Sequence, residues 1–220
     1  MSTPRYPLRE ALTACLLMIA LIAALSAWSA AAPGGQTIAG TILPLAFFWL
    51  PIGVMFVRGR DFAAYGLTLR DWPRGLRWAL LSALIVLPLY AVGHVLWQKH
   101  VGHTPHLHLG RALIAVFFRH LLVVALPEEL FFRGYVQTLL GQRLRRPAPQ
   151  WLGERWPAIL LTALLFALAH LAVDWQPARL AVFFPALLFG WLRERSGSLA
   201  APVLLHTLAN VTVFIFAGSV

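Results

Sequence analysis

Two adjacent glutamates, Glu128 and Glu129, lie inside a long apolar segment of the chain. An ionised carboxylate at bilayer depth costs at least about 2.5–3.5 kcal/mol, and intramembrane carboxylates are functional candidates for that reason. Arg133 follows Glu129 by four positions, and side chains four apart lie on one face of a helix. We therefore expect Glu129 and Arg133 to form an ion pair, which leaves Glu128 free for chemistry.

Three further polar residues interrupt later apolar segments. His170 ends the run Phe166-Ala-Leu-Ala-His170, and His206 and Asn210 lie four apart on one helical face. Polar groups inside lipid must meet one another or line a water-filled cavity. At a rise of roughly 1.5 Å per residue, Glu128 and His170 both lie about 20 Å from the same side of the membrane. These residues are thus expected to converge on one site.

The residue types favour hydrolysis by an activated water. A carboxylate can take a proton from water, while an asparagine amide and an imidazole N–H can stabilise an oxyanion. No serine lies beside the histidines, and Cys15 is in the first apolar segment, so no nucleophile is evident. A zinc site made of Glu128, His170 and His206 remains an alternative, although no His-Glu-x-x-His motif is present. Metal-free catalysis is the favoured interpretation.

The amino-acid composition is that of a membrane protein. Of 220 residues, 60% are hydrophobic and only 12% are charged, against about 25% charged in a typical soluble domain. Several stretches reach the roughly 20 apolar residues that cross a bilayer. The sequence predicts an all-α bundle of about seven to eight transmembrane helices in a single domain, residues 1–220, with the motifs at about 111–217. The expected spans are Ala11–Ala31, Ile38–Val57, Leu76–Trp97, Arg111–Leu140, Pro157–Val173, Arg179–Leu192 and Leu199–Ala217.

The basic residues predict the orientation of these spans. The formal net charge is +10, which short basic loops of a membrane protein explain without nucleic acid as a partner. With seven spans, three basic residues fall on the side of the C-terminus, namely Lys99, Arg111 and Arg179. Thirteen fall on the side of the N-terminus: Arg5, Arg9, Arg58, Arg60, Arg70, Arg74, Arg77, Arg143, Arg145, Arg146, Arg155, Arg193 and Arg195. We expect a cytoplasmic N-terminus and an outer C-terminus in a bacterial inner membrane.

The motifs together resemble a known family. Glu-Glu-x-x-x-Arg, then Phe-x-x-x-His, then His-x-x-x-Asn on successive late spans is similar to the signature of the CAAX-protease/bacteriocin-processing family of intramembrane endopeptidases. This family includes the Rce1-type CAAX prenyl endopeptidases and myxosortase-like relatives. The resemblance extends from roughly residue 119 to residue 213 and implies a bundle of about eight helices around a water-accessible cavity.

The resemblance also implies roles for the residues. Glu128 would activate the water with help from His170, and His206 and Asn210 would stabilise the oxyanion. Glu129, Arg133 and Phe166 would support the site. The partners would be the lipid bilayer and a membrane-anchored peptide or protein substrate. No cofactor is expected, although zinc remains possible.

Two other classes of function stay open. The same carboxylates and histidines could relay ions through a transporter, but no inverted repeat supports this. A non-catalytic membrane protein is the other alternative. A histidine-rich stretch from His100 to His108 could bind a metal outside the membrane, and a solvated loop is the favoured interpretation.

Overall fold

The computed structural model describes residues 6–32 and 34–219 and is a bundle of helices. Short 3-10 turns, η1 (Phe62–Tyr65) and η4 (Pro177–Val182), precede α3 and α8, and two short strands, β1 (Thr104–Pro105) and β2 (Gly218–Ser219), pair antiparallel. The long helices are α1 (Pro7–Ala31), α2 (Gly35–Val57), α3 (Trp72–His100), α7 (Trp156–Asp174), α8 (Phe183–Ser196) and α9 (Ala200–Ile215). A further run is unbroken and consists of α4 (Ala112–Arg119), η2 (His120–Ala125), α5 (Leu126–Glu129), η3 (Leu130–Val136) and α6 (Gln137–Gly141).

Within the described residues, α1, α2, α3 and α7 are long and apolar enough to cross a membrane, and α9 is apolar but shorter. The expected all-α membrane bundle is confirmed. Three predicted starts differ from the observed ones by four residues: α1 begins at Pro7 rather than Ala11, α3 at Trp72 rather than Leu76, and α8 at Phe183 rather than Arg179. Pro177 starts a 3-10 turn that contains Arg179, and the α-helix begins only at Phe183.

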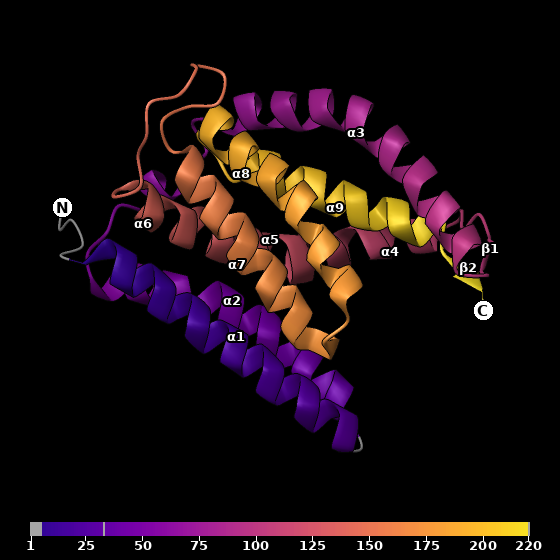
Figure 1. Ribbon diagram of the computed structural model, residues 1–220. Helices are drawn as coiled ribbons and strands as arrows, with labels where there is room; N and C mark the ends of the chain where they lie inside the picture. Colours follow the sequence, from indigo (N-terminus) through magenta and orange to yellow (C-terminus); the bar gives the residue numbers. More distant parts are fainter. Residues whose placement is uncertain (1–5, 33, 220) are drawn as a thin grey trace.

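The unbroken run α4–α6 forms the centre of the molecule. Figure 1 shows it between α1 and α2 on one side and α8, α9 and α3 on the other. Phe131, Phe132, Tyr135 and Leu139 on this run are buried. Inside a membrane such side chains gain from close packing rather than from leaving water, so the run that carries both glutamates is also the packed core of the bundle.

Two widened turns flank the glutamates. The segments η2 and η3 are π-helical, and the single α-helical turn between them holds Pro127, Glu128 and Glu129. Proline has no N–H to donate to the preceding turn. The helix nevertheless continues through Pro127, with its backbone ladder loosened on both sides. Such π-helical turns occur frequently at functional sites.

A polar cluster closes the end of the bundle that carries the N-terminus. Glu10 on α1 accepts hydrogen bonds from Arg58 and Arg60, which follow α2, and from the Tyr135 hydroxyl on η3. Burial alone would lower the pKa of Arg60, but its hydrogen bonds to Glu10 raise that pKa above its usual value. The cluster joins α1, the end of α2 and the central run.

The opposite end carries the histidine-rich loop and the C-terminus. Thr104 and Pro105 pair with Ser219 and Gly218, and the His108 ring lies 3.1 Å from the Ala217 carbonyl oxygen. The two ends of the bundle are thus distinct: the N-terminus and the 142–155 loop lie at one, and β1, β2 and the C-terminus lie at the other (Figure 1).

Gly190 on α8 tests the close packing of the helices. A Cβ atom there would lie 2.8 Å from Gln137 Oε1 and 2.8 Å from Ile159 Cγ2. Gly190→Ala should therefore lower the free energy of unfolding by about 1–3 kcal/mol, as overpacking does. Thermal unfolding in detergent measures this. Gly53→Ala is the matched control, because its Cβ would meet open space, and equal stability of the two variants would contradict the packing described.

Candidate active site

A buried ion pair lies at the centre of the candidate site. Arg133 Nη1 donates a 2.9 Å hydrogen bond to Glu129 Oε1, and neither side chain is exposed. Arg133 Nη2 also donates to the Ala186 carbonyl at 3.3 Å. The guanidinium carbon lies 4.3 Å from the centroid of the Phe166 ring and 5.3 Å from that of Phe189. The expected Glu129–Arg133 pair is present, and aromatic faces take the place of water around its cation.

His206 on α9 shares the carboxylate oxygen that Arg133 binds. Its Nδ1 lies 2.9 Å from Glu129 Oε1, and its ring stacks on Phe189 with centroids 5.1 Å apart. An ionised carboxylate only accepts hydrogen bonds, so Nδ1 must carry the proton. The other ring nitrogen, Nε2, lies 4.0 Å from Glu128 Oε2. That distance is too long for a hydrogen bond but short enough for attraction between charges.

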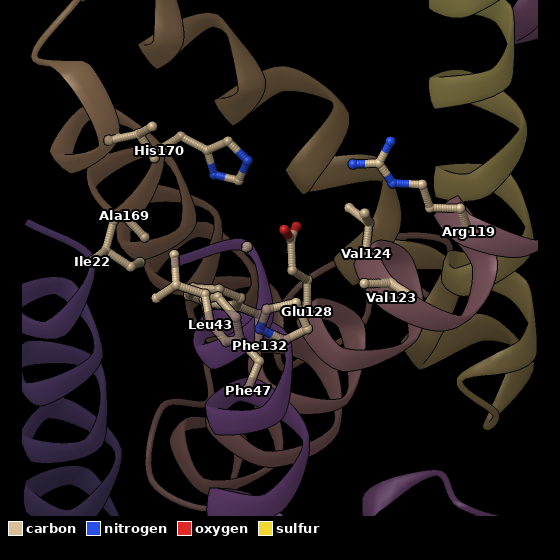
Figure 2. A pocket seen from close by; sticks show the side chains of 13 residues that line it. Ile22, Leu43, Phe47, Arg119, Val123, Val124, Glu128, Phe132, Ala169 and His170 are labelled. Atoms are coloured by element: carbon tan, nitrogen blue, oxygen red, sulfur yellow. The ribbon is translucent and has the colours of Figure 1, made fainter. Parts of the chain in front are cut away.

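Glu128 is the carboxylate that the ion pair leaves available. Its Oε2 atom is buried and has no hydrogen-bond partner among the described residues. The side chain lines a cavity of about 250 Å³ whose other walls are mostly apolar. Figure 2 shows the Glu128 carboxylate and the His170 ring directed into the same space. An unpaired acceptor in an apolar cavity is suited to hold and deprotonate a water molecule.

His170 is held by its own helix. Its Nδ1 donates to the Phe166 carbonyl oxygen at 3.0 Å, since a carbonyl can only accept. The proton on Nδ1 leaves Nε2 of the neutral ring as an acceptor. Phe166 also packs against the His170 ring, with centroids 4.3 Å apart, and against the guanidinium of Arg133. The phenylalanine of the motif therefore separates the histidine from the ion pair and positions both.

Asn210 is placed differently from the other candidates. It lines a second, smaller cavity of about 120 Å³ together with Phe166, His170 and His206. Glu128 is not among the residues that line this second cavity. His170 borders both cavities, so it lies between the carboxylate and the asparagine.

The comparison with known families bears on these motifs. Residues 110–212 match the family model described as type II CAAX prenyl endopeptidase Rce1-like. The match covers a little under half of the chain and shows a likeness to the CAAX protease family over the part that carries the motifs. The matched residues, 110–212, include every residue of the candidate site. None of the curated proteins and none of the solved structures that were compared matches the chain.

One residue of the Rce1-like domain was not singled out by the sequence analysis. Arg119, at the end of α4, lines the same cavity as Glu128 and His170, and Figure 2 shows its guanidinium directed toward them. No carboxylate forms a salt bridge with it among the described residues. The signal was available, because a cation inside an apolar span usually faces a cavity or a partner. Arg119 brings positive charge to the wall opposite His170.

The metal alternative would use Glu128, His170 and His206. Zinc requires three protein ligands at about 2.0–2.2 Å. Among residues 6–32 and 34–219, no three His, Cys, Asp or Glu side chains lie together as metal ligands would. His206 donates through Nδ1 to Glu129 and His170 through Nδ1 to the Phe166 carbonyl, as zinc-bound histidines also do. Catalysis without a metal therefore stays a prediction at this site.

Removing Arg133 should expose the cost of the buried pair. Arg133→Ala leaves Glu129 buried without its cation, and breaking such a pair costs about 3–5 kcal/mol. We expect a lower thermal unfolding temperature in detergent and a lower yield in membranes. Arg179→Ala is the control, since it breaks an ion pair with Asp174 that is exposed to solvent and contributes little to stability. Equal stability of the two variants would remove the structural role of Arg133.

Proposed function

We propose that the chain is an intramembrane endopeptidase in which Glu128 activates a water molecule for attack on a peptide bond. The observation that carries the proposal is the different state of the two glutamates. Glu129 is engaged through Oε1 by Arg133 and His206, whereas Glu128 lines a cavity and its Oε2 atom has no hydrogen-bond partner among residues 6–32 and 34–219. The Rce1-like domain supports an endopeptidase as the class of enzyme.

In the proposed reaction, the water oxygen attacks the carbonyl carbon of the scissile bond while Glu128 takes the proton. Nε2 of His170 accepts the second hydrogen of that water and so orients it. The proton held by Glu128 then passes to the nitrogen of the leaving amine as the carbon–nitrogen bond breaks. General acid–base catalysis of this kind contributes about 10²–10⁴-fold in rate.

The oxyanion is stabilised by His206 and Asn210 in this proposal. Nδ1 of His206 already donates to Glu129, so the ring can donate through Nε2 only as an imidazolium. Glu129, 2.9 Å from Nδ1, supports that charge while Glu128 holds the proton taken from the water. The Asn210 amide reaches the oxyanion from the adjoining cavity. A preorganised donor of this kind is worth about 3–4 kcal/mol in the transition state.

The proposed location is a bacterial inner membrane, with the N-terminus in the cytoplasm and the C-terminus outside. The thirteen arginines on the side of the N-terminus support this orientation. The substrates are membrane-anchored peptides or proteins, because a cavity inside the bilayer is open only to a chain that is itself held there.

Glu128→Gln should remove proteolysis without unfolding the protein, because the amide keeps the shape of the side chain but cannot take the proton. Mass spectrometry of membrane peptides from cells that express each variant measures the newly formed chain ends. We expect at least about a 10²-fold loss of these products. Glu154→Gln, in the 142–155 loop, should match the wild type. Near wild-type turnover by Glu128→Gln would eliminate Glu128 as the base.

The proposal also predicts independence from metal. Purified protein should hold substoichiometric zinc and keep its activity after exhaustive chelation and dialysis, because Glu128, His170, His206 and Asn210 can act without an ion. Metal analysis before and after chelation, with activity measured in parallel, provides the test. Stoichiometric zinc, with activity lost on chelation and restored by zinc alone, would contradict the mechanism.

A further inference from the structure

The cavity that contains Glu128 lies toward one end of the bundle. Gly40 in its wall is five residues from the start of α2 at Gly35 and seventeen from the end at Val57. Val173 in its wall directly precedes the end of α7 at Asp174. His170 is four residues from that end and fourteen from Trp156 at the other. Two helices of opposite direction thus place the cavity near the same end.

That end is the one with few basic residues. It contains the turn between α1 and α2, the histidine-rich loop after α3 and the segment after α7. The loop cations that belong to it are Lys99, Arg111 and Arg179, whereas twelve of the described arginines belong to the opposite end. In membrane proteins the side with the excess of Lys and Arg is the cytoplasmic one. The position of the cavity and the distribution of charge are independent observations.

We infer that the cavity opens toward the extracytoplasmic face and receives peptide segments that emerge from the bilayer on that face. The inference rests on the proposed function for the statement that such segments are cleaved. At roughly 1.5 Å per residue, His170 lies only about 6 Å from the end of α7 on this side and about 21 Å from the other end. Arg119, in the same wall, is likewise seven residues from the start of α4 at Ala112, so the cavity extends from Glu128 toward this end.

The inference restricts the substrate class. The substrates are membrane-anchored proteins cleaved on their outer flanks, and a C-terminal tail modified and held on the cytoplasmic face lies on the wrong side of the cavity. Arg119 in the wall gives this entrance a positive charge. Segments with a carboxylate close to the cleaved bond therefore meet a complementary charge, since a guanidinium binds carboxylates in a bidentate manner.

Cysteine labelling tests the inference without relying on proteolysis. The full chain carries Cys15→Ser, which removes the single native cysteine, and either Gly40→Cys or Gln150→Cys. A Cβ at Gly40 meets open space, so the cavity accepts a thiol there, and Gln150 is exposed in the loop at the opposite end. A membrane-impermeant maleimide is applied to intact cells and, separately, to inside-out membrane vesicles. Val173→Cys repeats the measurement from α7.

We expect the cysteines at 40 and 173 to be labelled in intact cells and to lose labelling in inside-out vesicles, with the reverse for the cysteine at 150. Labelling of all three from the same side would show that the cavity opens toward the basic end. The fully reversed pattern would show that the orientation is wrong, and protection of the cavity cysteines on both sides would show that it opens to neither face. Each of these outcomes overturns the inference, while the fate of Glu128→Gln decides the proteolysis separately.

Discussion

The ion pair between Glu129 and Arg133 is the interaction on which the rest of the site depends. Both side chains are fully buried, so neither charge can be left alone without a penalty of several kcal/mol. Four groups from other helices contact the pair: the Ala186 carbonyl and the Phe189 ring from α8, the Phe166 ring from α7, and the imidazole of His206 from α9. One charged contact in a low-dielectric environment thus joins η3 to the three helices that carry the remaining site residues.

The different roles of Glu128 and Glu129 follow from this ion pair. Glu129 has its charge neutralised and its Oε1 atom engaged twice, whereas Glu128, on the neighbouring face of the same turn, meets a cavity and the edge of His206. The π-helical turns on both sides of that turn set the faces on which the two side chains emerge. A structural carboxylate and a reactive one therefore stand next to each other in the sequence because they have different neighbours in space.

Much of this arrangement could be predicted from the sequence, since polar residues are conspicuous in apolar spans. The spacing of Glu129 and Arg133 predicts their contact, because it depends only on helix geometry. The contact between Glu129 and His206 could not be predicted in this way, because it joins residues 77 positions apart through the packing of α9. The placement of Asn210 in an adjoining cavity and of Arg119 beside Glu128 likewise depends on how the helices cross. The predicted starts of α1, α3 and α8 each differ by four residues from the observed ones, because an apolar composition does not mark the residue at which a helix begins.

The protonation of His206 tests most directly whether Glu129 organises the site. Nitrogen NMR of the protein with ¹⁵N-labelled histidine, reconstituted in lipid nanodiscs, reports which ring nitrogen of each histidine carries a proton. The His206 signal is assigned by its loss in His206→Gln. We predict a protonated Nδ1 in the wild type and the loss of this fixed protonation in Glu129→Gln. An Nδ1 without a proton in the wild type would contradict the account, because Glu129 would then not be holding His206 toward Glu128.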